Sequence, residues 1–239
     1  MNEWRIVVGD NALNYRINEW KHVFKLDPAK AISDEHLEQL CESGTDAIIV
    51  GGTDQITIDN VLDLLYRVRR YAIPCALEVS EMDAITPGFD HYFIPMVLNS
   101  TEKKWMMDIH HEGIKQYKEL IDWNETWMEG YCIMNPDAKA FKKTACMIPT
   151  EEDVLGFAFM AEHIFHLPIF YLEYSGIYGD PTLVEKIKQE LAETLLFYGG
   201  GISNEAEAEK MKEHADVIVV GNSIYTDFQS ALKTVKAVQ

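Results

Sequence analysis

The sequence predicts a single α/β domain, built as a modified TIM (β/α)8 barrel that lacks its third helix. Eight short apolar runs recur along the chain, and segments with helical periodicity separate most of them. The length of 239 residues suits one barrel of this kind. Two late turns, at residues 199–201 and at Gly221, are glycine-bearing, and each follows an apolar run and precedes a helical pattern. Turns after strands seven and eight bind phosphate in many such barrels.

The apolar runs have the length and composition of buried parallel strands. They occupy residues 23–26, 47–50, 75–79, 92–97, 131–134, 169–173, 195–198 and 217–220. The helical patterns cover residues 34–41, 58–70, 102–121, 151–165, 181–192, 205–214 and 223–235. Alternation of the two predicts a parallel sheet with right-handed crossovers.

The connection between residues 79 and 92 is too short for a helix and two loops, and Pro87-Gly88 interrupts it. The sequence therefore predicts a gap in the outer helical ring at the third position. No linker or second domain is visible, so residues 1–239 are assigned to one domain with residues 1–19 as an N-terminal extension. In that extension, Ile6-Val7-Val8 is interpreted as an extra strand or a loose arm.

Composition narrows the possible partners and the compartment. The formal net charge of −18 provides no basic surface for nucleic acid, although local donors can still bind an anionic substrate. The four cysteines lack metal-ligand or redox spacing, so we interpret them as reduced thiols of a cytoplasmic protein. No apolar run reaches the roughly 18 residues that a transmembrane segment needs.

The first predicted strand ends in Lys25-Leu26-Asp27. Since side chains alternate along a strand, Lys25 and Asp27 point the same way, into the barrel or its mouth. Charged residues at the carboxyl end of a barrel strand indicate catalysis or ligand binding. The alternative is a mutual ion pair that only fills space.

The second strand ends in Gly51-Gly52-Thr53-Asp54, and Thr53 offers a hydroxyl that could lie near Asp27. Hard oxygen ligands of this kind suit Mg²⁺, which usually keeps several waters and bridges to phosphate. A plain glycine-rich turn with a helix cap is the alternative.

The sixth strand carries Tyr171 and Glu173 on one face, and Glu173 interrupts an apolar run. A carboxylate there could accept a proton from a hydroxyl nucleophile, or could be a structural glutamate with satisfied hydrogen bonds. Glu78, Asn99 and Ser100 are weaker candidates. The histidines, including the pairs 110–111 and 163/166, have no third ligand at metal spacing.

Five segments, taken in order, resemble one family. They are residues 20–28, Gly51-Gly52-Thr53-Asp54, Tyr171-Leu172-Glu173-Tyr174-Ser175-Gly176, residues 198–202 and Val220-Gly221-Asn222. The chain from about Trp20 to its C-terminus is similar to the PcrB-type heptaprenylglyceryl phosphate synthases, the bacterial relatives of archaeal geranylgeranylglyceryl phosphate synthase. That family has a TIM barrel without the third helix.

The resemblance implies a Mg²⁺-dependent prenyltransferase that joins sn-glycerol 1-phosphate to a long polyprenyl diphosphate and releases diphosphate. It implies that Lys25 and Glu173 are catalytic and that Asp27 and Thr53 hold Mg²⁺. It implies that glycerol phosphate is held by Lys25, Tyr171, Leu172, Glu173, Tyr174, Ser175, Gly176, Gly201, Gly221 and Asn222. It also implies a homodimer. The polyprenyl tail is expected in an apolar groove near the missing helix.

Two other functions remain open from the residues alone. One is another phosphate-binding barrel enzyme, such as a sugar-phosphate isomerase or a flavin enzyme. The other is a non-catalytic interaction protein that retains the barrel. Three charged residues at one rim, Lys25, Asp27 and Glu173, argue against the second.

Overall fold

The structure is a computed structural model that describes residues 16–239. The segment Ile6-Val7-Val8, interpreted above as a strand or an arm, lies outside these residues.

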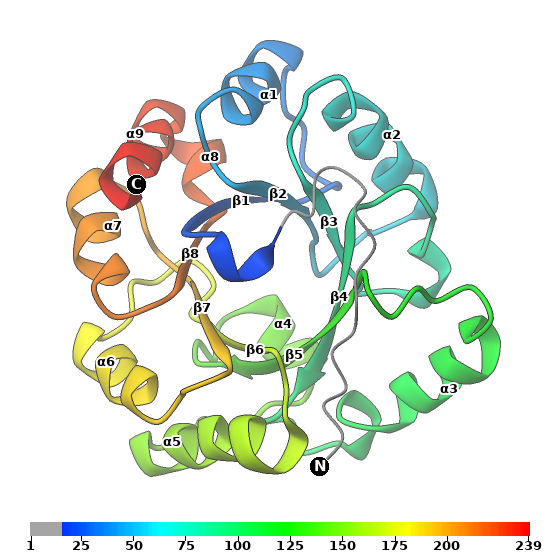
Figure 1. Cartoon of the computed structure of the whole chain (residues 1–239), viewed down its shortest axis with the longest axis vertical. Coiled ribbons are helices and arrows are strands. Elements are labelled where there is room, and N and C mark those ends of the chain that lie inside the picture. The colour runs from blue at the N-terminus through cyan, green and yellow to red at the C-terminus, as the bar shows by residue number, and fades with distance from the viewer. Residues whose placement is uncertain (1–15) are drawn as a thin grey trace, which may run out of the picture.

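Within the described chain, eight parallel strands form a closed barrel in chain order, and β8 pairs with β1 (Figure 1). The strands are β1 (His22–Leu26), β2 (Ala47–Val50), β3 (Cys75–Glu78), β4 (His91–Val97), β5 (Thr126–Ile133), β6 (Ile169–Glu173), β7 (Leu195–Gly199) and β8 (Val217–Val220). All eight predicted strands are present.

Most of the helices surround the barrel as an outer ring, whereas α4 lies over one end of the barrel (Figure 1). The helices are α1 (Asp34–Cys41), α2 (Ile58–Val68), α3 (Asp108–Tyr117), α4 (Lys139–Lys143), α5 (Glu151–Met160), α6 (Pro181–Gln189), α7 (Glu205–Lys212), α8 (Ser223–Thr226) and α9 (Phe228–Val238). Short turns of helix add η1 (Ile17–Glu19), η2 (Met82–Ala84), η3 (Lys103–Trp105) and η4 (Ala161–Phe165). Side-chain caps fix several of the starts; Thr57 and Thr150, for example, form capping boxes at α2 and α5.

The predicted gap in the helical ring is confirmed. Residues 79–90, which connect β3 to β4, contain only the single helical turn η2. The connection instead lays Ile85, Pro87 and Phe89 along the side of the barrel, where they line a cavity. The barrel wall is therefore uncovered by a helix at this position.

Several expectations about the helices and strands are wrong. The helix predicted over residues 223–235 is two helices, α8 and α9, because Asp227 leaves the helical region at φ −146°. The helix predicted over residues 102–121 is two pieces, η3 and α3, because Met107 leaves the helical region at φ −139°. Strand β5 begins at Thr126, well before the apolar run, since Glu129-Gly130 interrupts that run. Helix α4 was not predicted, because five residues with three lysines show no apolar periodicity.

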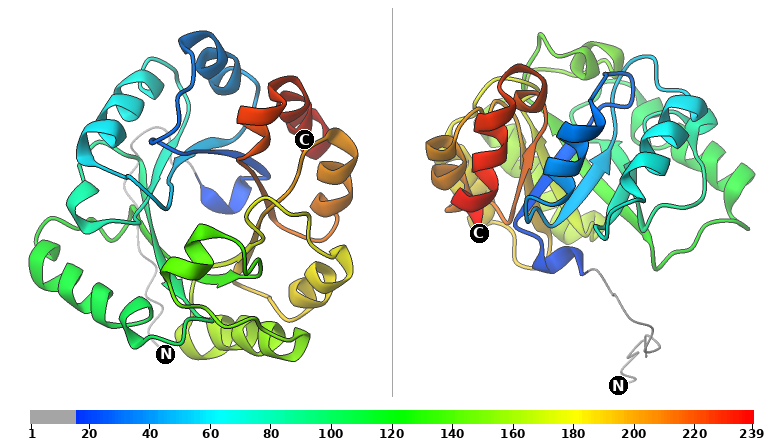
Figure 2. Two further views of the ribbon diagram at one scale, coloured as in Figure 1. Left: turned by 180° about the vertical axis from the view of Figure 1, so that it is seen from behind. Right: turned by 90° about the horizontal axis from the view of Figure 1, so that it is seen from above.

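Alternation along each strand divides the core into two layers. One set of side chains packs between the strands and the helices, and the other fills the barrel interior. Ile17 and Trp20 belong to the interior set, so η1 closes the bottom of the barrel, as Figure 2 shows from the side. The opposite end, where the strands have their carboxyl ends, stays open.

None of the helices between residues 16 and 239 is both long enough and apolar enough to cross a membrane.

Candidate active site

A cavity of about 1420 Å³ opens at the carboxyl ends of the strands. It starts among the turns after β6, β7 and β8 and extends past β3 and β4 into the gap left by the missing helix. At the mouth it is lined by charged and glycine-bearing turns, and farther out by apolar residues such as Ile85, Phe89 and Leu120. A single site can therefore hold a polar group and a long apolar group side by side.

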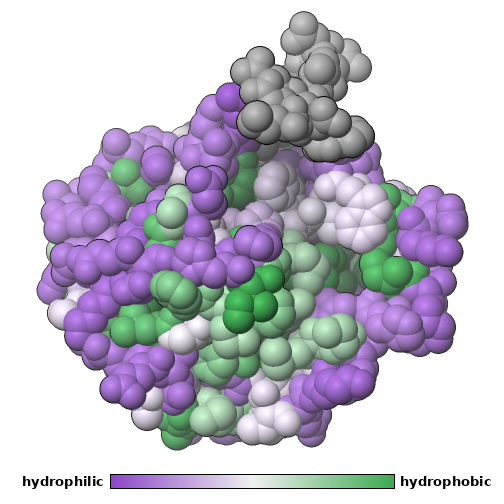
Figure 3. Space-filling model, turned by 60° about the horizontal axis from the view of Figure 1, so that its bottom comes forward, coloured by the Kyte–Doolittle hydropathy of each residue, from purple (hydrophilic) through white to green (hydrophobic). Residues whose placement is uncertain are grey.

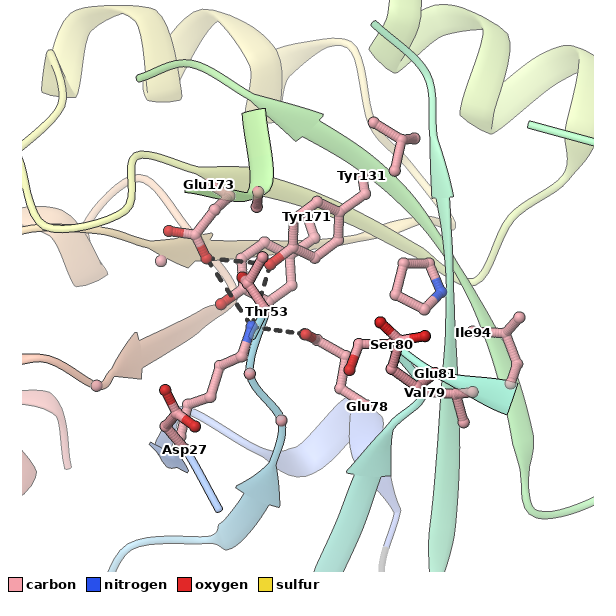
Figure 4. A pocket seen from close by; sticks show the side chains of 18 of the residues that line it. Asp27, Thr53, Glu78, Val79, Ser80, Glu81, Ile94, Tyr131, Tyr171 and Glu173 are labelled. Atoms are coloured by element: carbon pink, nitrogen blue, oxygen red, sulfur yellow. Dashed lines mark hydrogen bonds and ion pairs between the residues drawn. The ribbon is translucent and has the colours of Figure 1, made fainter. Parts of the chain in front are cut away.

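Four side chains from four strands meet inside the mouth (Figure 4). Lys25 Nζ on β1 lies 2.7 Å from Glu78 Oε2 on β3, 3.1 Å from the Tyr131 hydroxyl on β5 and 4.0 Å from Glu173 Oε2 on β6. The Tyr131 hydroxyl donates in turn to Glu173 Oε2 at 3.1 Å. We call these four residues the inner cluster.

The position of Lys25 argues against a mutual ion pair with Asp27, the alternative made from the sequence. Its ammonium pairs with Glu78 and Glu173, and the structure shows no ion pair between it and Asp27 among the described residues. Lys25 and Asp27 do face the same cavity, as alternation predicts. Lys25 is therefore held at the cavity wall rather than used to neutralise Asp27.

Burial and charge shift the pKa values of the inner cluster. Burial alone would lower the pKa of Lys25, but the carboxylates of Glu78 and Glu173 outweigh it, so the pKa of Lys25 is raised and the side chain stays charged. Burial raises the pKa of Glu173 above its ordinary 4.5, and the nearby Lys25 charge and the Ser175 N–H oppose that rise. Glu173 is thus a stronger proton acceptor than an exposed glutamate, and the cluster holds it in place.

A tight turn after β6 positions the other oxygen of Glu173. Ser175 has φ +43° and Gly176 has φ +89°, and the Ser175 N–H donates to Glu173 Oε1. Left-handed backbone is uncommon for a residue such as Ser175. Both oxygens of Glu173 are therefore bound while its carboxylate still borders the cavity.

The glycine turns after β7 and β8 lie at the same end of the cavity. Gly201 has φ +58°, and a Cβ at this position would lie 2.1 Å from the Ile177 carbonyl carbon, so only glycine fits. A Cβ on Gly176 would lie 3.0 Å from Asn222 Nδ2, which shows how closely the β6 and β8 turns approach. Gly176, Gly201, Gly221 and Asn222 all line the cavity.

Asp27, after β1, and Thr53, after β2, both line the cavity mouth. A Cβ on Gly52 would lie 2.6 Å from Asp27 Oδ1, so the bare backbone of the β2 turn is what lets this carboxylate sit there. No group of three His, Cys, Asp or Glu side chains within residues 16–239 could hold a metal. One carboxylate and one hydroxyl are hard oxygen ligands, and they fit Mg²⁺, which takes few protein ligands and completes its shell with water and phosphate.

Two of the residues predicted to contact substrate do not line the cavity. The side chains of Leu172 and Tyr174 pack in the layer between strands and helices, because they alternate with Tyr171, Glu173 and Ser175 along β6 and its turn. Among the weaker candidates, Asn99 is structural, since its side-chain amide bonds to the carbonyls of Ile133 and Met147.

The profile of the PcrB family matches residues 15–239. The chain belongs to the PcrB family. It is 63% identical over 224 residues to the heptaprenylglyceryl phosphate synthase of Oceanobacillus iheyensis, which covers 93% of this chain and 98% of that protein. It is 61% identical over 224 residues to the enzyme of the same name from Anoxybacillus flavithermus, over 93% of this chain and 97% of that protein.

Solved structures support the fold. A crystal structure of (S)-3-O-geranylgeranylglyceryl phosphate synthase from Thermoplasma acidophilum, in complex with its substrate sn-glycerol-1-phosphate, superposes with a TM-score of 0.81 at 20% identity. The similarity covers 92% of this chain and 93% of that chain. At this identity the likeness shows the shared barrel and not the ligand.

Sequence reasoning missed several residues that this PcrB-family site brings together. Glu78 was a weak candidate, yet it is the nearest partner of Lys25. Tyr131 was not considered. It begins a predicted strand, and its hydroxyl was the feature of the sequence that could have marked it. Lys139 and Lys143, on the unpredicted helix α4, also line the cavity.

Proposed function

We propose that the chain is a heptaprenylglyceryl phosphate synthase. It would transfer a heptaprenyl group to the free primary hydroxyl of sn-glycerol 1-phosphate and release diphosphate, as the names of the relatives above suggest. The observation that carries this proposal is the placement of the Glu173 carboxylate and the three glycine-bearing turns at one end of a cavity whose other end is apolar. That arrangement suits a small phosphorylated alcohol facing a long hydrocarbon.

The glycerol phosphate would bind at the glycine end of the cavity. Backbone from Gly176, Gly201 and Gly221 borders that end, and Asn222 offers a side-chain amide. Lys25 supplies a positive charge from the wall, and Tyr171 forms the adjacent surface. These contacts would fix the alcohol next to Glu173, and such positioning supplies much of the rate.

Glu173 would orient the attacking hydroxyl and accept its proton. As the alcohol oxygen forms its bond to the allylic carbon, the bond from that carbon to the diphosphate oxygen breaks. The proton goes to Glu173 and the bonding electron pair leaves with diphosphate. Tyr131 and the Ser175 N–H hold the carboxylate in the required orientation.

Asp27 and Thr53 would hold Mg²⁺, which neutralises charge on the departing diphosphate when it is bound. The turn that carries Thr53 is tied to the far side of the mouth, because Lys143 Nζ donates to the Thr53 carbonyl at 2.8 Å. This bond would help to hold the Thr53 turn in place for the metal.

The apolar arm of the cavity would take the polyprenyl tail. It runs between the β3–β4 connection and α3, where Ile85, Phe89, Ile109 and Tyr117 line it. A helix at the third position of the ring would cover this arm, so the missing helix is what makes room for the tail.

We also propose that the enzyme is a cytoplasmic homodimer. Apolar side chains gather on the side of the molecule that carries α5 (Figure 3), and among them Phe159 and Ile164 are 50% and 65% exposed. Met147 and Ile148, just before α5, add to this surface. Contiguous apolar surface of this kind is typical of a subunit contact.

The test is an assay of the purified protein with radiolabelled sn-glycerol 1-phosphate, heptaprenyl diphosphate and Mg²⁺. We expect a labelled lipid product, little product with sn-glycerol 3-phosphate, and loss of product after chelation that added Mg²⁺ restores. A protein that makes no product with polyprenyl diphosphates of any length overturns the proposal. Turnover of a sugar phosphate, or a yellow bound flavin, would indicate the other barrel enzymes instead.

A further inference from the structure

Helix α4 places two lysines over the barrel mouth. In Figure 2, left, this short helix lies across the open end of the barrel. Lys139 Nζ lies 2.9 Å from Asp54 Oδ2, and Lys143 Nζ pairs with Glu81 and with the Thr53 carbonyl. Both lysines line the cavity, and both partners come from loops that border the Asp27–Thr53 side of it.

Lys139 and Lys143 lie on the same face of α4. Residues four apart lie on the same face of a helix, so Lys139 and Lys143 point together toward the mouth. Lys142, between them, does not line the cavity, although its ammonium lies 3.8 Å from Asp137 at the rim. One helix thus carries two lysines that face the cavity and a third that does not.

The acidic residues at this side of the mouth explain why two nearby lysines would matter for binding an anion. Asp27, Asp54 and Glu81 are all acidic and all border the cavity. A diphosphate placed there beside one divalent ion would face uncompensated negative charge unless cations stand near it. Lys30 also lines the cavity, but its ammonium lies 3.2 Å from Asn222 Oδ1 and over the Tyr225 ring, beside the β8 turn.

We propose that Lys139 and Lys143 bind the diphosphate group of the prenyl substrate and stabilise it as it leaves. The inference rests on the proposed function and names a part of the site that the resemblance does not assign. Each ammonium would exchange a carboxylate partner, Asp54 or Glu81, for a phosphate oxygen. Lysine suits this role because its flexible stem carries a compact charge that can move between partners.

The ion pairs with Asp54 and Glu81 keep the two lysines at the cavity when no diphosphate is bound. The pairs join α4 to the loops after β2 and β3, and these pairs are partly exposed, with 32% and 44% of the Lys143 and Glu81 side chains accessible. Exposed pairs of this kind contribute little to stability. They are therefore weak enough for a diphosphate to displace.

The experiment compares Lys139→Met, Lys143→Met and the double variant with Lys142→Met, the matched control on the same helix. KM is measured separately for the prenyl diphosphate and for sn-glycerol 1-phosphate. Binding of inorganic diphosphate with Mg²⁺ is measured by calorimetry, which does not depend on turnover. Thermal unfolding checks that each variant folds.

We expect each single cavity-facing variant to weaken diphosphate binding about 3- to 10-fold and the double variant more than 10-fold, as lost charge-assisted contacts predict. KM for the prenyl diphosphate should rise in parallel, while KM for sn-glycerol 1-phosphate stays within about twofold and Lys142→Met behaves as the wild type.

Unchanged diphosphate affinity in the double variant overturns the inference. An equal rise of both KM values also overturns it, because that result indicates that the lysines only brace the loops. An equal loss in Lys142→Met would assign the effect to overall charge and likewise overturn it. A wild-type protein that binds diphosphate but forms no prenyl product contradicts the proposed function and leaves the two lysines as diphosphate ligands.

Discussion

Two glutamates stand in the barrel interior on neighbouring strands, and their surroundings differ. Glu173, at the end of β6, is 8% exposed, borders the cavity, and bonds to the Tyr131 hydroxyl and the Ser175 N–H. Glu129 on β5 pairs in register with Ile169, at the start of β6, and is fully buried below the cavity. Neither oxygen of Glu129 has a hydrogen-bond partner anywhere in residues 16–239.

The comparison teaches that burial alone does not make a catalytic group. Burial raises the pKa of both carboxyls, and for Glu129 the charge of Glu78 raises it further, well above 4.5. An ionised carboxylate without hydrogen-bond partners is costly to bury, so the surroundings of Glu129 raise its pKa and favour the protonated acid. Glu173, beside Lys25 and two hydrogen-bond donors, can ionise and is open to substrate.

The largest expected effect separates the two glutamates by activity. Glu173→Gln removes the proton acceptor and should lower kcat about 10²- to 10⁴-fold. Glu129→Gln, the same change on the neighbouring strand, replaces a neutral acid with a neutral amide and should leave kcat within about threefold of the wild type. Steady-state kinetics of both variants under identical conditions measure the difference. Equal losses of kcat in the two variants would contradict the distinction between a catalytic Glu173 and a structural Glu129.

A smaller effect tests the backbone at the mouth. Gly201→Ala would place a methyl group against the Ile177 carbonyl carbon at φ +58°, so the turn must shift. Strain of 1–3 kcal/mol is typical of such positions, and KM for sn-glycerol 1-phosphate should rise roughly tenfold.

The matched control for that variant is Gly156→Ala in α5, where an added Cβ meets no atom within 4 Å. Alanine is the better helix former, so the control should keep KM and gain about 0.5–1 kcal/mol of stability. A Gly201→Ala protein with normal KM would show that the β7 turn does not contact the phosphate.

The smallest effect is the pH dependence of stability that Glu129 contributes. Because its pKa is raised in the folded state, the folded protein keeps a proton that the unfolded chain releases above about pH 4.5. The stabilisation that this proton provides is complete below the pKa of Glu129 in the unfolded chain. It is lost as pH rises toward the pKa of Glu129 in the folded protein. The wild type should therefore lose stability relative to Glu129→Gln as pH rises. The difference between their free energies of unfolding should change by at most about 1.4 kcal/mol per pH unit. Denaturant titrations at pH 5, 6 and 7 measure this, and a constant difference would mean that Glu129 is ionised in the folded protein.

The sequence was sufficient for the barrel, since its strands are continuous apolar runs and the missing helix follows from a short connection. It failed at β5, where Glu129-Gly130 interrupts the pattern, and at α4, which is held by lysine pairs to other loops rather than by an apolar face. Both failures have the same origin, because tertiary contacts rather than local preference fix these segments.

The site was predictable only in part, for a related reason. Lys25 and Glu173 are visible because a charge at the end of an apolar strand is unusual. Their common partners are not visible, since the approach of Lys25 to Glu78 and Tyr131 depends on strand register around the barrel. The assignments of Mg²⁺ to Asp27 and Thr53, and of substrate to the glycine turns, stay predictions.

The most direct test of the role of Glu173 is the pH profile of kcat/KM for sn-glycerol 1-phosphate, measured on the wild type and on Glu129→Gln. The account predicts an acid limb with a midpoint above 4.5, where Glu173 loses its function on protonation, at the same pH in both proteins. A wild-type profile without an acid limb, or a limb that moves to lower pH when Glu129 is replaced, would contradict it.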